Sequence, residues 1–149
     1  MADAAQRGRL VALYTLDGEW SRAAAQPNKL AAEIRLAWWS ETLEAFAGGG
    51  RADHPAVEAL GAVATGELLP LLTQAINAYA DGRSADAADR VAEASVRLLD
   101  PGATLEQPST AAFPAVAHRT LAPLHVRGRT LGELEKRLRI TWAVLRGRV

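Results

Sequence analysis

The residues best suited to chemistry in this chain form a short polar strip between residues 14 and 21. Tyr14, Asp17 and Ser21 are spaced three and four residues apart, so on a helix they lie on one face. If this face lines a cavity, Asp17 is an inward-pointing acid that could serve a site. In the alternative interpretation, Asp17 is a solvated aspartate beside Gly18 on the outside of the helix.

A second acidic pair, Asp86 and Asp89, lies near the predicted start of a helix. Negative charge at that end is favourable because of the helix dipole, which explains the pair without a magnesium ion. The histidines are His54, His118 and His125. No carboxylate stands at ligand spacing from the last two, so we expect no metal site there.

Motifs of the common enzyme classes are missing from the sequence. There is no glycine-rich phosphate loop after a strand, no HExxH and no GxSxG. The chain has no cysteine, which excludes disulfides, thiolate nucleophiles and thiolate metal ligands. The glycines at 48–50 follow a predicted helix and indicate a loop.

Two adjacent tryptophans, Trp38 and Trp39, stand in the stretch "EIRLAWWSETLEAF". Neighbouring residues cannot share a helix face, because each step turns the chain by about 100°. The two rings therefore extend different apolar stripes, one formed by Leu30, Ile34 and Trp38 and the other by Leu36, Trp39, Leu43 and Phe46. Such a helix is packed on two sides, or it lies between a core and a cavity, with Arg35 buried beside it.

The composition favours a single all-α domain. Of 149 residues, 49% are hydrophobic and 23% charged, and 32 are alanine and 15 arginine. Alanine and arginine favour helices, whereas β-branched and aromatic residues are scarce. No apolar run is long enough to cross a bilayer and no secretory signal precedes the domain. We therefore expect a cytoplasmic protein, with peripheral contact to the inner membrane as an option.

The positions of the turn and capping residues predict a bundle of six or seven helices. Asn28 is the predicted N-cap of the tryptophan helix and Asp53 that of a short third helix, and Gly66 is expected to separate the third helix from the fourth. The domain then divides into N-terminal helices (1–99), a proline-containing linker (100–112) and basic C-terminal helices (113–149). Within these parts, the predicted helices cover about residues 5–25, 28–46, 54–65, 67–80, 84–99, 113–126 and 130–146. The fifth starts at Ser84 or Asp86, and the sixth is interrupted at Pro114 and Pro123.

Charge is distributed unevenly along the chain. Residues 1–112 hold nine Arg or Lys and fifteen Asp or Glu, a net −6, whereas residues 113–149 carry +6. The last predicted helix has an apolar stripe surrounded by Lys136, Arg137, Arg139, Arg146 and Arg148. This basic surface either docks on the acidic body or lies on an anionic membrane surface. Nucleic acid is not expected as a partner, because aromatic residues are not interleaved with the basic ones.

The segment "LVALYTLDGEWSRAAAQPNKLAAEIRLAWWSETLEAF", followed by "HPAVEAL", resembles the N-terminal third of the squalene/phytoene synthase family. It is most similar to the bacterial and mitochondrial branch that has "EIRLxWWxxxLE". The terminal stretches "FPAVAHRTLAPLHVR" and "LRITWAVLRGRV" are similar to the last helices of that family. The resemblance implies an isoprenoid-synthase-like all-α fold. Family enzymes join two isoprenyl diphosphates with Mg²⁺ held by two aspartate-rich motifs.

The chain departs from this family pattern at its acidic motifs. The resemblance places the first set of aspartates near Ser21, Arg22 and Ala25, and an arginine repels Mg²⁺ instead of binding it. The second set belongs between Leu99 and Phe113, where this chain has its proline linker, and Asn77 stands where related sequences favour aspartate. Arg35, Trp38 and Trp39 would then be walls of a cavity that has lost its carboxylates.

We therefore expect a shortened, non-catalytic member that acts as a binding or assembly partner through an apolar groove. The predicted groove residues are Tyr14, Asp17, Ser21, Arg35, Trp38 and Trp39, without a cofactor or metal. The expected occupants are a protein partner, a second copy of the chain or a lipid-like isoprenoid chain. Mitochondrial relatives in this branch are associated with assembly of respiratory complex I, which is compatible with such a role by analogy only. The alternatives are a residual Mg²⁺-dependent isoprenyl diphosphate transferase and a peripheral membrane module.

Overall fold

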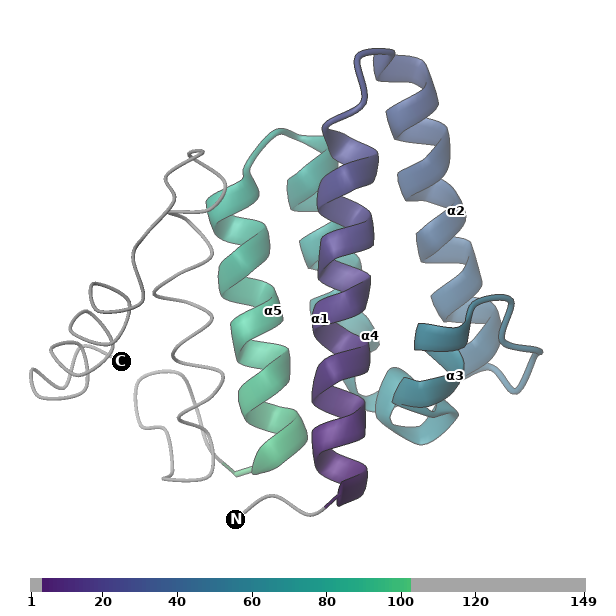
Figure 1. Cartoon of the computed structure of the whole chain (residues 1–149), viewed down its shortest axis with the longest axis vertical. Helices are drawn as coiled ribbons and strands as arrows, with labels where there is room; N and C mark the ends of the chain where they lie inside the picture. Colours follow the sequence, from purple (N-terminus) through teal and green to yellow (C-terminus); the bar gives the residue numbers. More distant parts are fainter. Residues whose placement is uncertain (1–3, 103–149) are drawn as a thin grey trace, which may run out of the picture.

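The computed structural model describes residues 4–102, which form five α-helices and no strand (Figure 1). This confirms the all-α class. The two further helices predicted at 113–126 and 130–146 lie outside the described residues. The five helices are α1 (Ala4–Ala24), α2 (Lys29–Ala47), α3 (Pro55–Leu60), α4 (Ala62–Ala80) and α5 (Ser84–Leu99).

The ends of α2 follow the sequence signals. Asn28 caps the helix as predicted, because its side-chain oxygen accepts a hydrogen bond from the Ala31 N–H at 3.2 Å. The helix ends in the glycines at 48–50, and Gly49 has a φ of +89° that few other residues tolerate. A Cβ at Gly50 would lie 2.7 Å from the carbonyl oxygen of Ala45. Only glycine fits this turn.

Two predicted boundaries are wrong. His54, not Asp53, caps α3, since its Nδ1 accepts a hydrogen bond from the Ala56 N–H at 3.2 Å. The fourth helix begins at Ala62 and continues through Gly66. The break lies at Gly61, whose φ of +87° redirects the chain between α3 and α4, because a positive φ interrupts a helix whereas a glycine with helical angles only weakens it.

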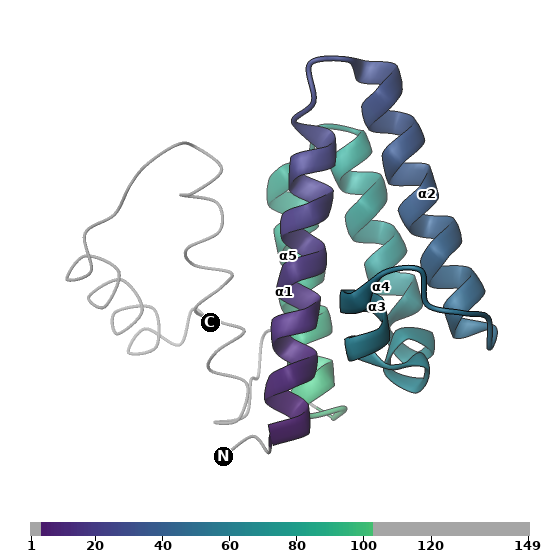
Figure 2. The same cartoon turned by 45° about the vertical axis from the view of Figure 1, so that its right-hand side comes forward.

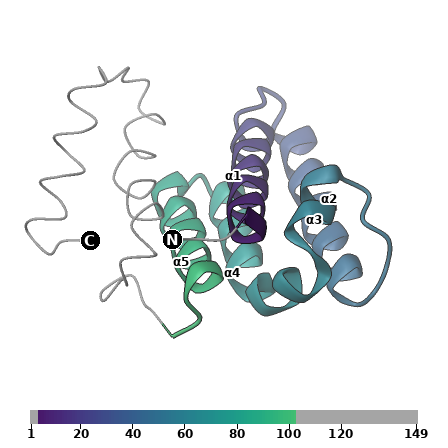
Figure 3. The same ribbon diagram turned by 60° about the horizontal axis from the view of Figure 1, so that its bottom comes forward.

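The four long helices alternate in direction, so that α1 and α4 run one way and α2 and α5 the other (Figure 1). In Figures 1 and 3, α2 and α5 lie on opposite sides of the bundle, with α1 and α4 between them, and in Figure 2 α1 lies in front of α5. The most extensive packing is that of α4 against α5 and α2, while α3 packs mainly on α1. Both ends of the described chain, Ala4 and Gly102, lie at the same end of the bundle.

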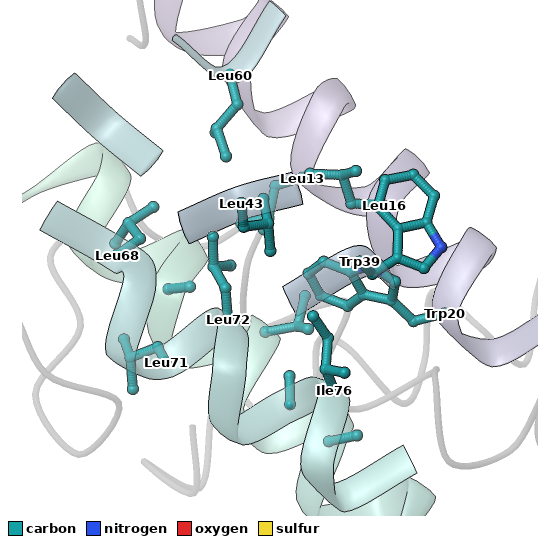
Figure 4. Packing of buried hydrophobic residues seen from close by; sticks show 14 of the residues in the cluster. Leu13, Leu16, Trp20, Trp39, Leu43, Leu60, Leu68, Leu71, Leu72 and Ile76 are labelled. Atoms are coloured by element: carbon teal, nitrogen blue, oxygen red, sulfur yellow. The ribbon is translucent and has the colours of Figure 1, made fainter. Parts of the chain in front are cut away.

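The core forms where these helices meet (Figure 4). Its largest side chains, Trp20 of α1 and Trp39 of α2, are 0% and 2% exposed. Other large residues of this core come from α1, α2, α3 and α4, and those labelled in Figure 4 are Leu13, Leu16, Leu43, Leu60, Leu68, Leu71, Leu72 and Ile76. None of the helices in residues 4–102 has the length and hydropathy that crossing a bilayer requires.

Candidate functional site

The polar strip of α1 points toward α4. Asp17 is buried, and its Oδ1 accepts a hydrogen bond of 2.7 Å from the hydroxyl of Tyr79. Tyr14 and Ser21, one turn before and after, are half-buried. Asp17 is therefore not solvated: it lies inside the bundle and links α1 to α4.

Both tyrosines near Asp17 hold their protons more tightly than usual. Burial raises the pKa of Tyr79 above its ordinary value near 10. The negative charge of Asp17 and the hydrogen bond to Asp17 raise this pKa further, whereas a hydrogen bond with Ser21 lowers it. Burial also raises the pKa of Tyr14, an effect opposed by a hydrogen bond to Ser95 and reinforced by Asp17. Each hydroxyl is therefore neutral at physiological pH and can donate a hydrogen bond.

The two adjacent tryptophans have different environments. Trp39 is 2% exposed, and its ring contacts the ring of His54 edge-on, with 4.9 Å between centroids. Trp38 is 40% exposed and meets Trp39 edge-on at 4.8 Å. The indole Nε1 atoms of Trp20 and Trp39 are buried and have no hydrogen-bond partner within the part of the chain that the structure describes.

An apolar surface remains on the outside of α2. Leu30, Ile34 and Trp38, which we call the outer face of α2, are 65%, 62% and 40% exposed and follow each other at intervals of four residues. Of the large hydrophobic residues exposed within 4–102, only Val11 and Val63 lie elsewhere. Three such side chains in one row form a continuous apolar patch, unlike the isolated exposed residues common on protein surfaces.

The charged residues around the outer face are mostly acidic. The exposed acidic residues of α2 are Glu33, Glu41 and Glu44, and its exposed basic residues are Lys29, at the start of the helix, and Arg35. Arg35 is exposed too, so the prediction that it is buried is wrong. Lys29 is 3.9 Å from Glu33 and pairs with it weakly.

The six predicted groove residues therefore do not line one common surface. Tyr14, Asp17 and Ser21 belong to the polar cluster inside the bundle, whereas Trp39 is in the core and Arg35 and Trp38 are on the outside of α2. Sequence reasoning missed Tyr79, the partner of Asp17. No local signal could have found it, because the two residues are 62 positions apart.

The pockets that open on the described part of the molecule include the following three. One of about 360 Å³ includes Arg9, Glu67 and Arg97 in its wall, and one of about 160 Å³ lies beside Tyr79. The third, of about 460 Å³, lies at the turn between α4 and α5, where Arg83 binds Asp81 at 2.8 Å and Asp86 at 2.6 Å. Asp86 is thus engaged by an arginine, and neither Trp38 nor Trp39 lines any of these three pockets.

Within residues 4–102, no group of three or more acidic or histidine side chains is arranged to hold a metal ion. The basic residues predicted as a C-terminal surface, which are Lys136, Arg137, Arg139 and Arg146, lie outside the described residues. Comparison of the chain with models of protein families, with curated proteins and with solved structures finds no match.

Proposed function

We propose that this protein is a non-catalytic relative of the squalene/phytoene synthases with an isoprenoid-synthase-like fold, and that it acts as a binding or assembly partner through the outer face of α2. The observation that carries the proposal is the exposed row of Leu30, Ile34 and Trp38. An apolar helix face with anchors at i, i+4 and i+8 suits a partner helix, which would cover these side chains from water.

The position of the row within the resembling sequence supports the same proposal. The "EIRLAWW" string forms the middle of α2 and supplies both the core anchor Trp39 and the exposed Trp38. The stretch that carries the resemblance therefore builds the docking surface as well as the core. Aromatic residues such as Trp38 are enriched at interfaces because one ring buries a large area at little entropic cost.

The residues at the positions of the family's first acidic motif do not fit a magnesium site. Ser21 offers a hydroxyl and Ala25 a methyl group, and Arg22 is an exposed cation paired with Glu19. Magnesium requires several convergent oxygen ligands, which this set does not supply. Asp17 is the nearest acid that points inward, and Tyr79 occupies one of its oxygens.

A photo-crosslinking amino acid placed at position 34 of the full chain tests the proposal. In the cells from which the protein comes, we expect one reproducible adduct of higher mass, identified by mass spectrometry. The matched control is the same amino acid at Val63, which is 77% exposed on α4 and should give no such adduct. Equal patterns from both positions, or none from position 34, would reject the outer face as a docking surface.

Calorimetry separates the proposal from the residual transferase. We expect no heat when farnesyl diphosphate is added to the full chain, with or without Mg²⁺. Binding that depends on Mg²⁺ would instead support the enzyme. Flotation with anionic liposomes tests the function as a peripheral membrane module. That function would be favoured if the full chain floats with the liposomes and a chain that ends near residue 129 does not.

A further inference from the structure

We propose that the partner of the outer face of α2 is a basic amphipathic helix, in which Lys or Arg residues run beside an apolar stripe. This inference rests on the proposed function, because it names the chemistry of the partner that binds the same surface. It is supported by the acidic side chains that lie along the outer face and by the lack of cations that pair with two of them.

Acidic side chains form a row along one side of the outer face. Glu33 and Glu41 are both exposed, and they belong to a row with intervals of four residues that starts three positions after Leu30. On a helix, such a row runs directly beside the row of the apolar residues. Glu44 is exposed too and follows three residues after Glu41. We call Glu33, Glu41 and Glu44 the acidic row, and a partner that covers the outer face must also meet its charges.

Glu41 and Glu44 stand where an isolated helix disfavours negative charge. Glu44 is in the last turn of α2, which contains no basic residue, and this is the negative end of the helix dipole. Glu41 is the neighbour of Glu44 on the helix surface, so the two carboxylates repel each other. Within residues 4–102, neither side chain forms an ion pair. Cations supplied by another molecule would relieve this repulsion.

The outer face is accessible to a long partner helix. α2 lies at the edge of the bundle, on the side away from α5 (Figures 1 and 3). A helix that lies along α2 can place its apolar stripe over Leu30, Ile34 and Trp38, which are all exposed. Lys and Arg suit the positions beside that stripe, because their long apolar stems cover the neighbouring surface while their charged ends reach the acidic row.

A second copy of α2 is a less favourable occupant. In an antiparallel pair of identical helices, each side of one helix meets the same side of its copy, so the two acidic rows would run beside each other. In a parallel pair in register, Glu41 would meet its own counterpart, because it lies within the outer face. Lys29 offers little relief, since its Nζ already lies 3.9 Å from a carboxylate oxygen of Glu33. A partner of different sequence avoids both conflicts.

Two synthetic helical peptides test the inference on the full chain. The first consists of leucine and lysine, with leucine at alternating intervals of three and four residues so that it forms one stripe. The second has glutamate in place of every lysine. The protein carries no net charge, so its overall charge favours neither peptide. We expect fluorescence anisotropy to show that the leucine–lysine peptide binds about tenfold more tightly, because two or three exposed ion pairs are replaced by repulsions in the other peptide.

Charge reversal on α2 shows whether the preference comes from the acidic row. Glu41→Lys together with Glu44→Lys should weaken binding of the leucine–lysine peptide about tenfold and strengthen binding of the leucine–glutamate peptide. This pair should not lower the free energy of unfolding, since cations suit the last turn of a helix. The matched control combines Glu58→Lys with Glu67→Lys, exposed positions on α3 and α4. It changes the net charge equally and should alter both affinities by less than about twofold.

Equal affinities for the two peptides, or no binding of either, would overturn the inference. A control pair that weakens binding as much as the reversal on α2 would overturn it as well.

The adduct from position 34 separates this inference from the proposed function. Glu41→Lys together with Glu44→Lys should lower the yield of the adduct, and the crosslinked segment of the partner should carry Lys or Arg beside apolar residues at helical spacing. An adduct with an unchanged yield, or one with the mass of two copies of this chain, overturns the inference but leaves the outer face as a docking surface. A clear preference for the leucine–lysine peptide without any adduct in cells supports the inferred chemistry of the surface and rejects the proposed function.

Discussion

The buried hydrogen bond between Tyr79 and Asp17 makes the stability of the protein depend on pH in the alkaline range. Tyr79 binds its proton more tightly in the folded chain than in the unfolded chain. Its contribution to stability is therefore complete below the unfolded pKa, near 10, and is lost as the pH rises from there toward the folded pKa. We predict that Tyr79→Phe removes this part of the pH dependence.

The expected magnitudes follow from the two tyrosines. Above pH 10, each lowers the free energy of unfolding by up to about 1.4 kcal/mol per pH unit, since the pKa of Tyr14 is raised as well. The chain has no other tyrosine and only two lysines, so little else titrates in this range. Tyr79→Phe should therefore halve the alkaline slope. At neutral pH it should cost about 1.5–3 kcal/mol, because a buried carboxylate loses a donor.

Urea unfolding followed by circular dichroism, at a series of pH values between about 8 and 11, measures both effects. Asp17→Asn is the control: burial is the largest cause of the raised Tyr79 pKa, so the alkaline slope should persist in this variant. In the wild-type protein, tyrosinate absorbance should appear only together with loss of helical signal. An alkaline slope as steep in Tyr79→Phe as in the wild type would refute this reasoning, as would tyrosinate in a fully helical protein at pH 10.

Three further predictions concern the helices and can be checked by the same unfolding measurements at neutral pH. Gly61→Ala should destabilise the protein by about 1–3 kcal/mol, because its φ of +87° and ψ of 143° lie in a region that residues other than glycine rarely adopt. Gly66→Ala, with open space around it inside α4, should instead stabilise the protein by about 0.5–1 kcal/mol. Equal effects of the two substitutions would contradict the assignment of the helix break to Gly61. Trp39→Ala should lower the free energy of unfolding by about 3–5 kcal/mol, because its side chain is buried, and Trp38→Ala should lower it clearly less. A larger loss from Trp38→Ala than from Trp39→Ala would mean that Trp38, not Trp39, is the buried ring. Asn28→Ala should lower the free energy of unfolding by about 1 kcal/mol, because α2 loses its capping hydrogen bond. An unchanged free energy of unfolding would show that water replaces this hydrogen bond.

The sequence predicted the elements that depend on local signals. Apolar periodicity and a strong capping residue defined α2, and the glycine run at 48–50 ended it. The predicted bounds of α1 and α5 also agree with the structure to within a residue or two. Such signals act within one helical turn, so a single chain is enough to read them.

The errors arose where two residues competed for one role. Gly61 and Gly66 both precede apolar stretches, and the sequence does not say which of them adopts a positive φ. His54 caps α3 through a ring nitrogen, although Asp53 belongs to a residue type that caps far more often. The ring of His54 also packs edge-on against Trp39 of α2, a tertiary contact that no local sequence pattern shows.

The candidate site was only partly predictable for a related reason. Periodicity identified the stripe of Leu30, Ile34 and Trp38 but could not say whether a core, a cavity or water lies against it. The partner of Asp17 comes from another helix, far along the chain. Burial and pairing across helices are properties of the assembled bundle, so the structure was needed to assign them.

The edge-on contact between Trp38 and Trp39 has a spectroscopic consequence. Two indoles with centroids 4.8 Å apart and planes at 66° couple their electronic transitions, which gives a pair of circular dichroism bands of opposite sign. One ring is held rigidly by the interior while the other faces outward, so the amplitude of this couplet reports how firmly the outward ring is held. Anything that settles on the exposed side of α2 should therefore be visible optically, without an added label.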